Sequence, residues 1–252
     1  MHDSPTIGLL GFGAFGRLAA THFTPHAAVT VHDPNVSETD ILSTGAQSGS
    51  LKISASCDAV VLAVPVQALP AALDAIAPHV RPGTIVADVA SVKTLPVQWM
   101  LERLPAHTHV VGTHPLFGPQ TAREHGAIAG EPIALCRARI DDDTFARVRE
   151  FVEGTLGLAP VELTPDEHDK QMAMVQVLTH LVGHAANSMD LPELPTATVA
   201  YRRLLQMKRN TQGDSEELFE AIQRLNPHAA AARDAFLTHM TDVARRAQGP
   251  GV

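Results

Sequence analysis

Short apolar runs alternate with amphipathic segments over the first two thirds of the chain. Each run is bounded by turn residues, which predicts strands buried on both faces of a sheet. The predicted strands cover residues 6–10, 28–33, 58–65, 84–89, 109–112, 132–136 and 160–164. Helical spacing predicts a helix that reaches residue 23 and further helices at residues 38–47, 66–80, 95–104 and 141–156. This alternation predicts a doubly wound, mostly parallel sheet of the α/β class.

The pattern changes after residue 164. No convincing strand follows, and apolar residues recur at helical spacing in residues 165–189, 196–210, 214–225 and 227–247. The breaks between these segments contain proline or glycine, as helix ends do. We therefore expect an α/β domain over residues 1–164 and an all-helical domain over residues 165–252.

A glycine-rich turn joins the first predicted strand to its helix. It consists of Gly11, Phe12, Gly13, Ala14, Phe15 and Gly16. In a dinucleotide-binding turn, the first glycine allows the sharp bend, the second leaves room for a pyrophosphate, and the third lets the helix pack on the strand. Free N–H groups at the helix start then face the phosphates. The turn favours a Rossmann-type domain that binds a dinucleotide; a glycine turn in another kind of α/β protein is the alternative.

The second predicted strand ends in Asp33, about 20 residues past the glycines, where a carboxylate can accept from a ribose 2′-hydroxyl. A carboxylate there repels a 2′-phosphate, and no arginine follows at once. We therefore expect NAD rather than NADP, unless Asp33 is an ordinary turn residue. Ligands of such sheets bind beyond the carboxyl ends of the strands. Val64 and Pro65, at the end of the third predicted strand, are therefore further candidates for cofactor binding.

Composition and charge exclude several classes of protein. The chain has 252 residues, a net charge of −8 and two cysteines. An acidic chain is poorly suited to nucleic acid, and no apolar run approaches the ~20 residues that span a bilayer. The N-terminal MHDSPT lacks the pattern of a secretory signal, and two separated cysteines form no disulfide framework. We expect a cytoplasmic protein that binds neither nucleic acid nor a membrane.

Two polar residues follow neighbouring predicted strands. His114 comes shortly after the strand 109–112, and Ser91 follows the strand 84–89. Since imidazole exchanges protons near neutral pH, His114 could bind or deprotonate a substrate hydroxyl as hydride leaves for a nicotinamide. Ser91 could hydrogen-bond the same hydroxyl. The alternatives are a histidine that caps a turn and a serine that caps a helix.

The helical part contains a histidine pair and a group of cationic residues. His180 and His184 stand four residues apart, but no third ligand is indicated, so we expect no metal site. The cationic residues are Arg202, Arg203, Lys208 and Arg209. An arginine among them could hold a substrate carboxylate in a bidentate manner. A solvated basic face is the alternative.

Five segments, taken in order, resemble the prephenate/arogenate dehydrogenase family of tyrosine biosynthesis. They are GFGAFG (11–16), DVASVK (88–93), GTHPLFGP (112–119), EHDKQMAMVQVLTHLVGH (167–184), and Tyr201 with NTQGD (210–214). The resemblance covers nearly the whole chain, and GTHPLFGP is its most specific part. It implies a Rossmann domain joined to a helical dimerisation domain, and hence a homodimer.

The resemblance also implies an NAD-dependent oxidative decarboxylation. In this family a cyclohexadienol loses hydride from its ring carbinol to a nicotinamide, and loss of the ring carboxylate as CO₂ makes the ring aromatic. By resemblance, His114 binds and polarises the ring hydroxyl, and Ser91 supports that hydroxyl and the nicotinamide. His180 is expected to face the same cleft, and Arg209 or Arg202 to hold a substrate carboxylate.

The expected substrate is prephenate, which would be converted to 4-hydroxyphenylpyruvate. Plant members specific for arogenate carry an acid where this chain has Cys136, so a partner for the amino group of arogenate is missing there. Glu124 could replace it, which leaves arogenate dehydrogenase and a dual-specificity cyclohexadienyl dehydrogenase open. No fused chorismate mutase or regulatory domain is expected. A β-hydroxyacid dehydrogenase that uses Lys170 and a non-catalytic NAD-binding regulator are more distant alternatives.

Overall fold

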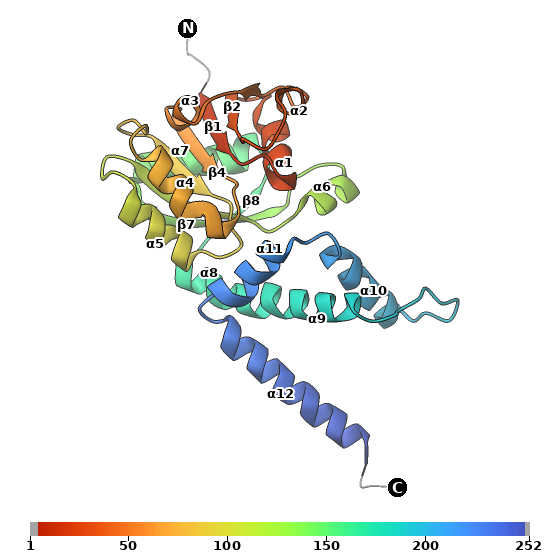
Figure 1. The fold of residues 1–252 in the computed structure, drawn as a ribbon. Coiled ribbons are helices and arrows are strands. Elements are labelled where there is room, and N and C mark those ends of the chain that lie inside the picture. The colour runs from red at the N-terminus through yellow and green to blue at the C-terminus, as the bar shows by residue number, and fades with distance from the viewer. Residues whose placement is uncertain (1–4, 250–252) are drawn as a thin grey trace. The chain divides into compact units, whose positions relative to one another are not determined.

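The computed structural model describes residues 5–249, which form two compact units (Figure 1). The division falls between residues 1–165 and residues 166–252. Residues 1–4, part of the segment in which no secretory signal is expected, lie outside the described residues. Among the described helices, none has both the length and the hydropathy needed to cross a bilayer.

One eight-stranded sheet organises the first unit. Its strands are β1 (Thr6–Leu10), β2 (Ala28–His32), β3 (Gln47–Ser48), β4 (Ala59–Leu62), β5 (Ile85–Asp88), β6 (His109–Pro115), β7 (Pro132–Arg139) and β8 (Ala159–Glu162). They lie in the order β3-β2-β1-β4-β5-β6-β7-β8, and each neighbouring pair is parallel except β6 with β7. The predicted α/β class with a doubly wound, mostly parallel sheet is confirmed. The chain direction across the sheet reverses at β1 and β4, where such sheets form a ligand crevice.

Helices cover both faces of this sheet (Figure 1). They are α1 (Ala14–Phe23), α2 (Glu38–Leu42), α3 (Leu51–Ala55), α4 (Leu69–Ile76), α5 (Thr94–Arg103), α6 (Pro119–His125) and α7 (Asp142–Glu150), with a 3₁₀ turn η1 (Val66–Ala68) and a π-helical turn η2 (Phe151–Thr155). Ile7 and Leu9 of β1 pack in one core with Ala20 of α1. On the opposite face, a Cβ on Gly8 would lie 1.8 Å from the carbonyl oxygen of Ser54 in α3, so only glycine lets α3 come this close.

Two local predictions in this unit are wrong, and the elements β3, α3 and α6 were not expected. The helix expected at residues 38–47 ends at Leu42, because Gly45 turns the chain with a φ of +83° and strand β3 follows. The strand expected to stop at residue 112 continues to Pro115, because antiparallel pairing with β7 extends it. His114 therefore lies within β6, opposite Ala134. Helix α6, which begins at Pro119, was not expected, although proline is common at the first position of a helix.

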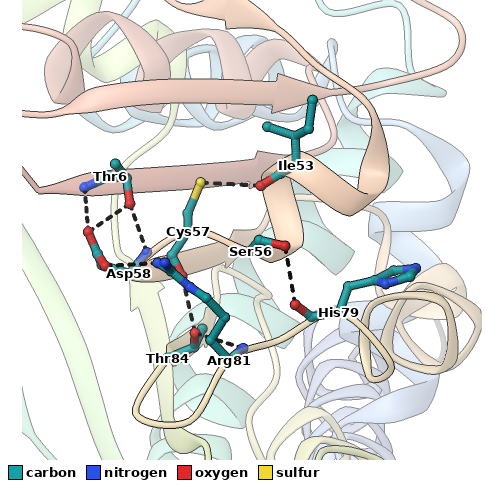
Figure 2. Close-up of polar contacts among 8 residues, drawn as sticks. All are labelled: Thr6, Ile53, Ser56, Cys57, Asp58, His79, Arg81 and Thr84. Atoms are coloured by element: carbon teal, nitrogen blue, oxygen red, sulfur yellow. Dashed lines mark hydrogen bonds and ion pairs between the residues drawn. The ribbon is translucent and has the colours of Figure 1, made fainter.

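A polar network joins the amino-terminal ends of the central strands (Figure 2). Oδ2 of Asp58 accepts hydrogen bonds from the backbone N–H of Thr6 at 2.9 Å and from its hydroxyl at 2.7 Å. Arg81 donates to Oδ1 of Asp58 at 2.9 Å, and the Thr84 hydroxyl donates to the carbonyl oxygen of Cys57 at 3.1 Å. The Thr6 hydrogen bonds, assisted by Arg81, lower the pKa of Asp58. The network fastens β1, β4 and β5 at the edge opposite the glycine turn.

The described residues of the second unit, 166–249, form helices and the loops between them, without a strand. Its helices are α8 (Pro165–Met172), α9 (Leu178–Asn187), α10 (Val199–Thr211), α11 (Glu216–Glu220) and α12 (Ala229–Ala247), with π-helical turns η3 (Ala173–Val177) and η4 (Ala221–Leu225). The predicted all-helical part is confirmed. A Cβ on Gly183 of α9 would lie 2.5 Å from the hydroxyl oxygen of Thr211, so this glycine lets α10 pack closely on α9.

A buried ion pair fixes the loop that follows β5. Lys93 donates to Oδ2 of Asp88, and both side chains are 0% exposed. The same oxygen accepts from the backbone N–H of Ala90 at 3.0 Å, and the Thr113 hydroxyl of β6 donates to the Asp88 carbonyl oxygen. The loop that carries Ser91 is thus held by Asp88 at its start and by Lys93 at its end. Thr113 joins the start of this loop to β6.

We expect Lys93→Met to lower the free energy of unfolding by about 3–5 kcal/mol, because it leaves the buried Asp88 carboxylate without its counter-charge. Urea unfolding followed by circular dichroism measures this change. Lys52→Met is the control, since Lys52 is exposed on α3 and its loss should change stability by less than about 0.5 kcal/mol. Equal stability of the two variants would contradict a structural role for the pair.

Candidate functional site

The glycine turn has the shape of a phosphate-binding turn. Gly11 has a φ of +93°, and a Cβ there would lie 2.6 Å from the carbonyl oxygen of Ala63. A Cβ on Gly16 would lie 2.2 Å from the carbonyl oxygen of Gly11, whereas a Cβ on Gly13 would meet nothing within 4 Å. Two glycines are therefore required by packing, and the third leaves open space. Helix α1 starts at Ala14 without a described side-chain cap, so its first N–H groups can face an anion.

Asp33 lies beside this turn, immediately after β2. Its Oδ2 accepts from the backbone N–H of Phe12 at 2.7 Å, and its Oδ1 accepts from the N–H of Asn35 at 2.9 Å. A carboxylate has about four lone-pair sites, so Asp33 can also accept from a ribose hydroxyl. The sequence did not reveal this second role, in which Asp33 anchors the glycine turn.

The remaining candidate cofactor residues surround the same turn. Val64 and Pro65 follow β4, with Val64 partly buried and Pro65 exposed. The ring of Phe15 lies 6.4 Å from the ring of Phe117, which joins the start of α1 to the GTHPLFGP segment. These positions at the carboxyl ends of the strands fit a bound dinucleotide.

Arg17 of α1 is a cationic residue that the sequence analysis did not single out. Its guanidinium lies 4.8 Å from the centre of the Phe12 ring and 3.9 Å from a carboxylate oxygen of Asp40. Only the folded chain shows that it stands beside the candidate nucleotide site. Because Asp40 offsets its charge, Arg17 favours a 2′-phosphate less than an unpaired arginine would.

The two candidate catalytic residues lie at the same edge of the sheet. His114 is 5% exposed near the end of β6. Ser91 is partly buried in the loop after β5, and β5 and β6 are parallel neighbours. The Thr113 hydroxyl, adjacent to His114, is bonded to the Asp88 carbonyl oxygen at the start of the Ser91 loop. Both residues thus lie at the carboxyl ends of neighbouring parallel strands, the edge at which such sheets bind ligands.

The two residues linked to substrate preference lie in different environments. Cys136 is 0% exposed in β7, where it pairs with Gly112, and a Cβ on that glycine would lie 3.3 Å from the Cys136 Cβ. Its side chain belongs to the interior rather than to an exposed binding surface. Glu124 is exposed on α6 and accepts from Gln120 at 2.8 Å. Of the two, only Glu124 presents a charged group to solvent.

An apolar cavity of about 400 Å³ lies against the face of the sheet that α1 and α7 cover, and Phe15 and Phe117 also line it. Its walls include Phe23, Val61 and Phe151. Burial lowers the pKa of His22, which also lines it. A mostly apolar space does not suit a substrate with two carboxylates.

In the second unit, His180 and His184 meet a third residue that the sequence analysis missed. Nδ1 of His180 lies 2.9 Å from Oδ2 of Asp214, and Nε2 of His184 lies 3.6 Å from the same oxygen. The sequence indicated no third ligand for the two histidines, and the folded chain brings a carboxylate beside them. Asp214 belongs to the NTQGD segment, far along the chain from α9, so helical spacing could not have revealed the contact.

Both candidate carboxylate-binding arginines lie on the exposed surface of α10. Arg209 donates to Gln206 at 2.9 Å and lies 3.5 Å from Glu193, and Arg202 donates to the carbonyl oxygen of Ala197 at 2.7 Å. A guanidinium has five N–H donors, so each arginine retains donors for a carboxylate.

Comparison with known proteins connects this geometry to one family. The family model described as the nucleotide-binding domain of prephenate dehydrogenase matches residues 37–159, and a TYRAAT1-like C-terminal domain matches residues 185–249. Arogenate dehydrogenase 1 of Arabidopsis thaliana is 28% identical over 91% of this chain and 37% of its own length. The 4-amino-4-deoxyprephenate dehydrogenase of Streptomyces pristinaespiralis is 29% identical over 90% of this chain and 79% of its own length.

Solved structures share the fold across nearly the whole chain. The arogenate dehydrogenase of Synechocystis has a TM-score of 0.69 at 20% identity and matches 97% of this chain and 94% of its own. The prephenate dehydrogenase of A. aeolicus, in complex with hydroxyphenyl propionate and NAD⁺, has a TM-score of 0.72 at 17% identity, with coverages of 97% and 92%.

The length of the relatives differs from that of this chain. The chain spans 37%, 43% and 43% of the first three curated relatives, all arogenate or arogenate/prephenate dehydrogenases by name. Three observations nevertheless point to the same kind of protein. They are the matched nucleotide-binding domain, the shared fold, and the sheet edge that bears Ser91 and His114. The chain is similar to the prephenate/arogenate dehydrogenase family, whose nucleotide-binding domain matches residues 37–159.

Proposed function

We propose that the chain catalyses the NAD-dependent oxidative decarboxylation of prephenate to 4-hydroxyphenylpyruvate. The observation that carries this proposal is the position of His114, buried near the end of β6 and next to the strand whose loop carries Ser91. The glycine turn and Asp33 follow strands of the same parallel sheet, at the edge where such sheets bind nucleotides.

The residues of the first unit fit a bound NAD. The open space at Gly13 and the uncapped start of α1 suit the pyrophosphate, and Asp33 suits the ribose 2′-hydroxyl. The nicotinamide supplies a hydride acceptor for the ring carbinol carbon. The Asp40 carboxylate beside Arg17 supports NAD over NADP.

His114 and Ser91 act on the ring hydroxyl. His114 accepts the hydroxyl hydrogen bond and draws the proton away as the C–O bond gains double-bond character, and Ser91 holds the same oxygen in position. A hydrogen bond in a buried site is stronger than in water. The C–C bond to the ring carboxylate then breaks, CO₂ leaves, and the remaining electron pair completes the aromatic ring. Because aromatisation favours the reaction, few catalytic groups are needed.

The helical unit supplies substrate-binding residues and a dimer interface in this proposal. His180 and either Arg209 or Arg202 bind the substrate, with an arginine on a carboxylate. Leu237, Met240 and Val243 are exposed at three-residue spacing on α12. An exposed apolar stripe of this kind supports association with a second copy of the chain.

Two related substrates are the second candidates. Three relatives are named for arogenate, and the relative matched over 79% of its length is named for 4-amino-4-deoxyprephenate. Arogenate carries a side-chain amino group that prephenate lacks, and exposed Glu124 could pair with it; 4-amino-4-deoxyprephenate has an amino group in place of the ring hydroxyl. The absence of an acid at Cys136 favours prephenate.

We expect His114→Asn to lower kcat/KM about 10²- to 10⁴-fold, the usual contribution of a positioned acid–base group. The Kd for NAD, measured by fluorescence titration, should stay the same because His114 contacts the substrate. His26→Asn, at an exposed position, is the matched control. Unchanged turnover in the His114 variant would remove His114 from the mechanism.

Replacing Asp33 with serine should shift cofactor preference toward NADP, since it removes a charge that repels the 2′-phosphate. A change of about 1.4 kcal/mol in this repulsion corresponds to a tenfold change in the ratio of kcat/KM for the two cofactors. Steady-state rates with each cofactor measure the ratio. Asp74→Ser, a change at an exposed acid, should leave it unaltered, and an unaltered ratio in Asp33→Ser would show that Asp33 does not contact the ribose.

The substrate itself is tested by initial rates with prephenate, arogenate and 4-amino-4-deoxyprephenate, each with NAD and with NADP, followed by nicotinamide absorbance. We expect prephenate with NAD to react fastest. Faster reaction of arogenate would reject the Cys136 argument, and Glu124→Gln would then be expected to slow it, whereas faster reaction of 4-amino-4-deoxyprephenate would reject prephenate as the substrate. Failure of all three compounds to react would reject the proposed function.

A further inference from the structure

Three side chains of the helical unit aim their polar atoms at one point. They are His180 and His184 of α9 and Asp214, which follows α10. Nδ1 of His180, Nε2 of His184 and a carboxylate oxygen of Asp214 all lie within 4.8 Å of one another. The side chains are 17%, 27% and 13% exposed, respectively, so the group is sheltered but still accessible from solvent.

These atoms do not satisfy one another as hydrogen-bond partners. Nδ1 of His180 and Oδ2 of Asp214 are 2.9 Å apart, yet their orientation is not that of a hydrogen bond. Within residues 5–249, neither of these atoms nor Nε2 of His184 has any hydrogen-bond partner, and all three are buried. Buried polar atoms in folded proteins almost always have a partner. A single cation between them would provide one for all three.

The close packing of α9 and α10 builds this group. Gly183 lies between the two histidines in sequence, and the Thr211 side chain occupies the space where its Cβ would be. Asn187 donates to the Thr211 hydroxyl at 3.1 Å, and the N–H of Asp214 donates to the Thr211 carbonyl oxygen at 3.2 Å. Because Thr211 packs against Gly183 and its carbonyl oxygen accepts from Asp214, this contact places Asp214 beside the two imidazoles. The ring of Phe219 lies 4.2 Å from that of His184 and holds it in place.

We propose that His180, His184 and Asp214 form a binding site for a divalent transition-metal ion, for which zinc is the best fit. Zinc takes histidine nitrogen and carboxylate oxygen at about 2.0–2.2 Å, which places tetrahedral ligand atoms roughly 3–3.5 Å apart. The observed separations of 2.9 and 3.6 Å are close to that spacing. Magnesium and calcium are disfavoured, because they prefer sets of oxygen ligands.

The site has three protein ligands, so a fourth position is left for water or for an oxygen of a small ligand. The metal takes Nδ1 of His180, and the opposite ring nitrogen, Nε2, remains for other contacts. Metal binding is thus compatible with the substrate role proposed for His180 but does not depend on it.

The test is zinc binding to the whole purified chain after removal of metal with a chelator. Isothermal titration with Zn²⁺ should show a single ion per chain, and Co²⁺ should give the visible absorption of a tetrahedral site. His184→Asn and Asp214→Asn should each weaken zinc binding at least about tenfold, since even the loss of a hydrogen-bond partner of a ligand costs that much. His239→Asn, at an exposed histidine of α12, should bind zinc as the parent does.

Circular dichroism establishes that each variant is folded, and either of the two ligand variants suffices for the test. Absence of stoichiometric zinc binding, or binding unchanged in the folded ligand variants, would overturn the proposal and leave the three groups as a histidine–carboxylate ion pair. Because the readout is binding in the absence of substrate, its failure is distinguishable from failure of the proposed dehydrogenase activity.

Discussion

The buried pair of Lys93 and Asp88 is the constraint on which the candidate active site depends. Both side chains are fully buried, and a buried charge is strongly destabilising once its counter-charge is removed. Oδ2 of Asp88 holds both Lys93 and the backbone N–H of Ala90, which shapes the loop that carries Ser91. The bond from Thr113 to the Asp88 backbone links the same pair to the strand of His114. Asp88 thus joins the loop of Ser91 to the strand of His114, through its side chain and its backbone respectively.

Glycines, which lack a Cβ atom, allow the close packing of segments elsewhere in the structure. Gly11 and Gly16 let the first helix start directly on the end of the sheet, and Gly112 lies where a Cβ would come 2.7 Å from Val97. Gly183 has the same role between α9 and α10, where it brings Asp214 to the two histidines. Close backbone approach, rather than many polar contacts, builds both the nucleotide turn and the proposed metal site.

Similarity to the prephenate/arogenate dehydrogenase family and choice of substrate depend on different features of the chain. The nucleotide-binding edge depends on backbone shape, which a matched domain and a shared fold describe well. In the proposed function, the choice between prephenate and similar compounds that carry an amino group depends on single charged residues such as Glu124. Such residues can differ from one related protein to the next. For this reason related proteins with this fold bear names for several substrates.

The sequence by itself determined the features that depend on local order: the strand–helix alternation, the glycine turn, Asp33 at the end of its strand, and the change to helices after residue 164. Periodicity and spacing suffice there because neighbouring residues form each feature. Only the tertiary structure decided that His114 lies within an extended β6, that Cys136 is buried, and that Asp214 meets His180 and His184. Each of these outcomes is set by packing between segments distant in the chain, a free energy that no local pattern contains.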